Sequence, residues 1–128
     1  MRVTLCKLVI DLGTTADGLP ILHGLVNRMG RAKYPSPFPR ARLAVEIETD
    51  IDDGFGGGPL VVQLIDEDGG VLWKEEGEMR LPSPPSPGFR PLMAFDFDGV
   101  PEIPQPGSYR FDVLYRDEVI GWERIYFE

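Results

Sequence analysis

Residues 108–116 of the chain read SYRFDVLYR, and this stretch indicates the fold more clearly than any other. Its odd positions are all apolar, from Tyr109 to Tyr115, and three of the four even positions after the serine are charged. Successive side chains of a strand point to opposite faces of a sheet. The alternation therefore predicts a β-strand with one face in a core and the other in water.

Three other segments alternate in the same way, and their apolar positions are candidates for the same core. These positions are Leu43, Val45 and Ile47, then Leu60, Val62 and Leu64, then Met93, Phe95 and Phe97. The segments Val71–Leu81 and Val119–Phe127 complete the set of one-sided strands. Val3–Leu12 and Leu19–Met29 are apolar on both faces, which predicts strands that are central or covered on both sides.

The connections between these segments favour a two-sheet architecture. No segment shows helical periodicity, and three loops, at 34–39, 82–88 and 100–107, are rich in proline. Proline cannot donate to a sheet ladder, so these loops end strands and suit crossings between sheets. Tyr109 opens a late strand after a Gly turn, which is typical of the tyrosine corner of immunoglobulin-like sandwiches. We predict an all-β fold, an immunoglobulin-like antiparallel β-sandwich of seven to eight strands with little or no helix.

Length and composition limit the remaining possibilities. The 128 residues predict one sandwich domain over 1–128. No apolar stretch approaches a membrane span, and the N-terminus does not read as a signal peptide, so we expect a cytoplasmic protein with no membrane partner. The net charge of −8 argues against nucleic-acid binding.

The sequence contains few of the residues from which catalytic sites are usually built. The chain has one cysteine, Cys6, and one histidine, His23, and no serine stands in a nucleophile-elbow context. A Cys6–His23 pair is conceivable, but a buried, inert thiol is the favoured interpretation. We predict a protein that is not an enzyme and needs no cofactor.

Aromatic residues near the C-terminus are the leading binding candidates. Trp122 and Tyr126 flank Arg124, and Trp73 lies on an earlier strand. Exposed aromatics beside an arginine are typical of protein interfaces. A shifted register would instead place the aromatics in the core, and the sequence leaves both alternatives open.

Two charged groups of residues give alternative sites. Residues 1–42 carry a net charge of +5 and residues 43–128 a net charge of −13. An anion or small-ligand site in the basic part would use Arg28, Arg31, Lys33, Arg40 and Arg42. A Ca²⁺ site would use the loop carboxylates of Asp50, Asp52 and Asp53, although turn formation explains these acidic residues more simply.

An ordered set of features extends over the whole chain. It comprises Cys6, Gly18–Gly24, the entry Pro35–Pro39 into Leu43–Val45, Leu64–Gly69 and Pro106–Phe111. In this order of features the chain resembles a family of small, uncharacterised bacterial proteins that carry a domain of unknown function. The resemblance implies a stand-alone β-sandwich with no assigned activity, and it offers no functional residues.

The function expected from these observations is a non-enzymatic protein-binding or assembly module. It would act through a sheet face or an edge strand, with a protein partner or with itself as a homodimer. The anion site and the Ca²⁺-dependent module are the alternatives.

Overall fold

The computed structural model describes residues 1–49, 57–80 and 89–128. They form eight strands of six or more residues: β1 (Arg2–Thr14), β2 (Pro20–Leu25), β5 (Ala41–Glu48), β6 (Gly58–Ile65), β7 (Val71–Met79), β8 (Leu92–Phe97), β10 (Gly107–Tyr115) and β11 (Glu118–Phe127). Three short strands have two residues each: β3 (Arg28–Met29), β4 (Ser36–Pro37) and β9 (Glu102–Ile103). Within these ranges the structure contains no helix, and so none that could cross a membrane.

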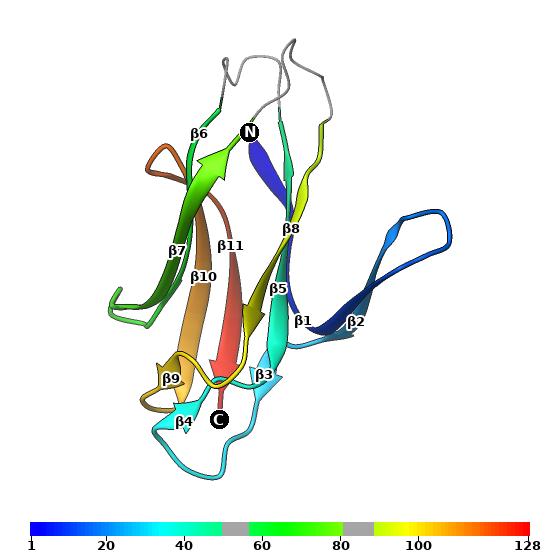
Figure 1. Cartoon of the computed structure of the whole chain (residues 1–128). Helices are drawn as coiled ribbons and strands as arrows, with labels where there is room; N and C mark the ends of the chain where they lie inside the picture. The colour runs from blue at the N-terminus through cyan, green and yellow to red at the C-terminus, as the bar shows by residue number, and fades with distance from the viewer. Residues whose placement is uncertain (50–56, 81–88) are drawn as a thin grey trace.

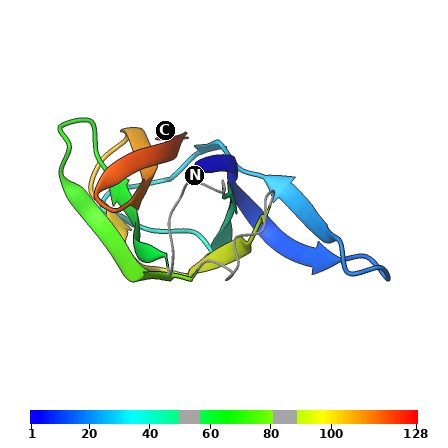
Figure 2. The same ribbon diagram turned by 90° about the horizontal axis from the view of Figure 1, so that it is seen from above.

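The strands form two main sheets. One has four strands in the order β2-β1-β5-β8, and the other has five in the order β3-β11-β10-β6-β7. Neighbouring strands are antiparallel, except that β3 runs parallel to β11. The short strands β4 and β9 pair with each other at one end. The two sheets face each other around one interior (Figures 1 and 2).

The strand order confirms the immunoglobulin-like sandwich. β1, β5 and β8 correspond to strands A, B and E of that fold, while β6, β10 and β11 correspond to C, F and G. β7 follows β6 in the chain and pairs with it at the edge of the five-stranded sheet. The chain then crosses to β8 in the four-stranded sheet. Each proline-rich segment of the sequence stands between strands of different sheets, as expected.

The core confirms the alternating positions. Leu43, Val45 and Ile47 of β5 are buried, as are the odd positions of β10 from Tyr109 to Tyr115. They pack with inward side chains of β1, β6, β8 and β11. Phe38 closes one end of the interior, with its ring 4.7 Å from that of Phe97 between centroids.

The tyrosine corner is present at the start of β10. The Tyr109 hydroxyl donates a hydrogen bond of 2.6 Å to the carbonyl oxygen of Gln105, four residues upstream. Tyr109 is buried, and this burial raises the pKa of its phenol above the usual value. The bond ties the connection from β9 to the central strand of the five-stranded sheet.

The largest departure from the sequence prediction is the β1–β2 ribbon. The second half of β1 pairs with β2 from Val9↔Leu25 to Thr14↔Pro20, and this two-stranded ribbon projects away from the sandwich (Figures 1 and 2). The expectation that the segment 19–29 would be central or covered on both sides is wrong for this chain alone, because β2 is an edge strand. Gly24 bends this edge at φ +69°, and Ile10 packs closely over it.

β1 and β11 meet along one side of the sandwich. A Cβ atom at Gly121 would stand 2.5 Å from the Cβ of Val3, so only glycine permits this approach. Next to it, Lys7 Nζ forms an ion pair of 3.1 Å with Glu123. These contacts hold the five-stranded sheet against the four-stranded sheet. The outer face of the five-stranded sheet is the one that faces the solvent.

Candidate functional site

The outer face of the five-stranded sheet collects the exposed aromatic residues of β11. In the register of β10 and β11, Trp122 stands opposite Asp112 and Arg124 stands opposite Arg110. On the other side of β11, Tyr126 pairs with Arg28 of β3. Since the odd residues of β10 point into the core, these even-numbered side chains share the outer face of the sheet. Asp112 is buried there, so the alternation was wrong in predicting a solvent-exposed side chain at this position.

Trp122 makes cation–π contacts with two guanidinium groups. The Arg110 Cζ is 5.7 Å and the Arg124 Cζ is 5.6 Å from the centroid of the indole, and the Trp122 side chain is 53% exposed. The neighbouring Tyr126 is 38% exposed, with the Arg28 Cζ 5.6 Å from its ring. We call Arg28, Arg110, Trp122, Arg124 and Tyr126 the aromatic–arginine face.

Ion pairs fix two of the three arginines. Arg110 Nε approaches Asp112 Oδ1 at 2.7 Å, and Arg110 Nη2 donates to Oδ2 at 3.2 Å. Asp112 is 3% exposed, and Arg110 is the ion-pair partner of this buried side chain. Arg28 pairs with Glu128 at 2.9 Å. Among the described residues, Arg124 contacts no carboxylate and makes only the cation–π contact.

An open hollow of about 530 Å³ borders Arg110 and Arg124. Its other wall is the turn between β6 and β7, where Asp66 accepts hydrogen bonds from the backbone N–H groups of Asp68 and Gly70. Glu67 accepts a bond of 2.8 Å from the N–H of Ser108 and so ties the turn to β10. The aromatic–arginine face therefore has a rigid, acidic border.

Trp73 does not belong to this face. Trp73 lies on β7 opposite Leu64 of β6, and its ring contacts those of Phe95, Phe97 and Phe111. Its indole is half-buried against the core. A bulge between Leu64 and Ile65 breaks the regular register of β6 and β7, which is why alternation alone does not assign the faces of β7.

Arg110 is the member of the face that the sequence did not indicate as a binding candidate. Its position in the alternating stretch already placed it on the wet side of β10. What the sequence lacks is the cross-strand register, which brings it beside Trp122. Arg28 was expected in an anion site, and the structure places it on this face instead.

The basic residues of the N-terminal part do not gather into one site. Arg40 and Arg42 line a hollow of about 510 Å³ at the base of the ribbon, where Asp11, Asp96 and Asp98 are also found. Arg42 and Asp96 form an ion pair of 2.8 Å. The residues that line this hollow therefore carry no net positive charge.

Arg31 lies near Arg28, because both contact Glu128. The Arg31 backbone N–H donates to the carbonyl of Glu128, and its guanidinium reaches the carbonyl of Pro37 at 3.5 Å. Lys33 is exposed. Of the basic candidates, Arg28 and Arg31 thus share a neighbour, and Arg40 and Arg42 line a separate hollow.

The Ca²⁺ candidates Asp50, Asp52 and Asp53 lie outside the described residues. In the ranges that the structure covers, no group of three or more His, Cys, Asp or Glu side chains is placed to hold a metal ion.

Cys6 and His23 are separated. Cys6 is buried on β1, and His23 stands opposite Asp11, five residues further along the same strand. At about 3.3 Å per residue the two are about 16 Å apart along the strand. Burial raises the pKa of the Cys6 thiol to about 12, so the sulfur stays protonated at neutral pH.

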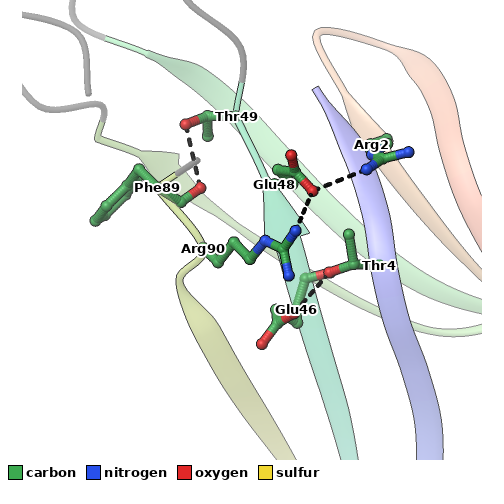
Figure 3. A network of polar contacts seen from close by, with 7 residues as sticks. All are labelled: Arg2, Thr4, Glu46, Glu48, Thr49, Phe89 and Arg90. Atoms are coloured by element: carbon green, nitrogen blue, oxygen red, sulfur yellow. Dashed lines mark hydrogen bonds and ion pairs between the residues drawn. The ribbon is translucent and has the colours of Figure 1, made fainter. Parts of the chain in front are cut away.

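A polar network joins the strand ends on the opposite side of the molecule (Figure 3). Glu48 Oε2 accepts from Arg2 at 3.0 Å and contacts Arg90 at 2.9 Å. The hydrogen bond from Arg2 holds the pKa of the Glu48 carboxyl below its usual value. Thr4 donates to Glu46 at 2.8 Å. These contacts join β1, β5 and the entry to β8, and their role is structural.

Comparisons with known proteins bear on the family and not on the site. No curated protein matches the sequence. Among solved structures, an immunoglobulin-like protein from Pseudomonas aeruginosa aligns with 99% of this chain and 95% of its own, at 16% identity and a TM-score of 0.48. Residues 3–127 match a family of unknown function, DUF6941. The chain therefore belongs to the DUF6941 family.

Proposed function

We propose that the protein is a non-enzymatic protein-binding module whose contact surface is the aromatic–arginine face. The observation that carries this proposal is the half-exposed Trp122, which makes cation–π contacts with the guanidinium groups of both Arg110 and Arg124. Tryptophan, tyrosine and arginine are the residue types most enriched in interface hot spots. Trp122, Arg124 and Tyr126 stand on β11, which pairs with β10 along its length, so they are presented with little freedom to lose on binding.

The chemistry of the face defines the partner. Among the described residues Arg124 forms no ion pair, although it borders the same hollow as Asp66, Glu67 and Asp68, whereas Arg28 and Arg110 are each paired with a carboxylate. A partner segment that complements the face supplies a carboxylate to Arg124 and an apolar or aromatic side chain to Trp122. The acidic turn at Asp66–Asp68 borders Arg110 and Arg124 and so limits the positively charged surface to the aromatic–arginine face. Together with the net charge of −8, this acidic border disfavours the phosphate backbone of a nucleic acid as the partner.

The test is a selection of binding peptides from a random displayed library on the intact protein. We expect the selected peptides to be rich in Asp and Glu beside aromatic residues. Trp122→Ala should weaken their binding by about thirtyfold or more, the loss typical of a hot-spot residue. The matched control is Val119→Ala, since Val119 lies on the same strand and is 52% exposed, against 53% for Trp122.

Two outcomes contradict the proposal. One is a set of peptides that bind Trp122→Ala and Val119→Ala equally well. The other is a single-stranded oligonucleotide that binds the wild-type protein and loses its binding in Trp122→Ala, which would assign the face to nucleic acid. Unchanged melting temperatures of both variants confirm that folding is intact.

A further inference from the structure

Among the described residues, β2 is an edge strand with no neighbour on its outer side. It ends the four-stranded sheet, and it pairs with a part of β1 that has already left the sandwich (Figure 2). A two-stranded ribbon is marginally stable by itself in water, and a third strand or a packed face is what usually stabilises one. The peptide groups on the outer side of β2 offer such a strand a place.

The ribbon exposes apolar side chains. Ile10, Leu19 and Leu25 are 64%, 60% and 67% exposed, and they are three of the four most exposed large hydrophobic residues in the described parts of the chain. Leu12 and Leu22 face each other across the strands and are half-buried. Exposure of this kind, grouped on one projecting element, marks a surface that another chain covers.

Charge distinguishes β2 from the other long edge strands. β7 carries Lys74, Glu75, Glu76 and Glu78, and β8 carries Asp96 in its ion pair with Arg42. Such charges hinder the addition of a further strand. β2 reads Pro-Ile-Leu-His-Gly-Leu and carries no Asp, Glu, Lys or Arg. Of the three edge strands, β2 is the one without a charged side chain, and only Pro20 and the bend at Gly24 interrupt its edge.

We propose that β2 pairs antiparallel with β2 of a second copy of this chain, around a two-fold axis. The two four-stranded sheets then continue into one another, and the apolar side chains of β2 in one copy pack beside those of β2 in the other. Ile10 lies on β1, one strand further from the two-fold axis. The lack of charge on β2 favours a second copy as the occupant. Asp11 and Asp17 of the ribbon are negatively charged, but antiparallel pairing sets the uncharged, apolar β2 of one copy beside the same strand of the other, so no charged residue of β2 faces a like charge. A two-fold pairing also closes, so the free edge does not lead to fibres.

This inference does not rest on the aromatic–arginine face, and its test is separate. The molar mass of the full chain is measured by light scattering at low and high salt over a wide range of concentration. We expect a dimer at both salt concentrations, because an apolar interface with main-chain hydrogen bonds is not screened.

Leu25→Lys supplies the charge that the edge lacks. Both copies carry the change, so we expect the dissociation constant of the dimer to rise by about a hundredfold or more. The matched control is Val100→Lys, at a loop residue of 68% exposure, which should leave the dimer unchanged. A wild-type protein that is monomeric throughout overturns the proposal and leaves β2 to the strand of another protein. A dimer that survives Leu25→Lys overturns it as well.

Discussion

The sandwich body and the β1–β2 ribbon have equally apolar strands, but only the body has a second sheet against it. Two residues of β1 show the contrast: Leu8 is 1% exposed and Ile10, two positions further along, is 64% exposed. In the body, apolar side chains stabilise the fold of one chain. In the ribbon the same kind of side chain contributes little to that fold, and it remains available for association.

The largest expected difference between the two regions is in stability. Phe111 is fully buried and its ring contacts those of Phe38, Trp73 and Phe97. We expect Phe111→Ala to lower the free energy of unfolding by about 4 kcal/mol. Leu12→Ala in the ribbon should lower it by less than about 1 kcal/mol, since Leu12 is only half-buried.

Denaturant unfolding at low protein concentration, where dimers are absent, measures both values. Comparable losses in the two variants would show that the ribbon is part of the cooperative core, and the contrast between body and ribbon would then fail.

A smaller effect is expected at the tyrosine corner of the body. Tyr109→Phe removes the hydroxyl that donates to the Gln105 carbonyl and leaves the buried ring in place. We expect a loss of about 1 kcal/mol in the free energy of unfolding, which is the usual net value of one hydrogen bond. Thermal or denaturant unfolding measures it, with Tyr126→Phe as the control, because Tyr126 is partly exposed and its hydroxyl is not part of the corner. An equal loss in the two variants would show that the hydrogen bond from Tyr109 to Gln105 does not stabilise the fold.

The smallest effect concerns the network at Glu48, where β1 joins the body. The pKa of Glu48 is depressed in the folded protein, chiefly by the hydrogen bond from Arg2. A depressed carboxyl pKa stabilises the fold above the unfolded value of about 4.5, and this contribution is lost as the pH falls through the folded value.

Glu48→Gln should therefore melt at a lower temperature than the wild type at neutral pH. The difference between the two melting temperatures should shrink toward acid pH. A difference that stays constant with pH would indicate that the ionised carboxylate is not the stabilising group.

The sequence predicted the body well because several of its strands, among them β5, β6 and β10, alternate between apolar and polar residues. Alternation at Leu43–Ile47 and at Tyr109–Tyr115 gave the inward residues, and the Gly turn before Tyr109 gave the corner. The placement of Trp73 could not be predicted, because a bulge in the pairing of β6 with β7 decides which way it points. The neighbours of Trp122 likewise depend on cross-strand register, which periodicity does not contain.

The ribbon is where sequence and structure differ most, and the difference has a physical reason. A strand that is apolar on both faces is expected to have both faces covered by other elements. The pattern does not say whether those elements belong to the same chain or to another one. For residues 19–29 the expectation of a covered strand fails within one copy. Pairing of β2 between two copies would satisfy the same pattern.

The most direct test of the account is hydrogen exchange of the backbone amides of β2 and β10 as a function of protein concentration. We predict that the amides of β10 are protected at every concentration, because they are bonded inside the sandwich on both sides. The amides of β2 should gain protection as the concentration rises in the wild type and in Val100→Lys, and should gain none in Leu25→Lys. Protection of β2 that does not change with concentration would contradict the account.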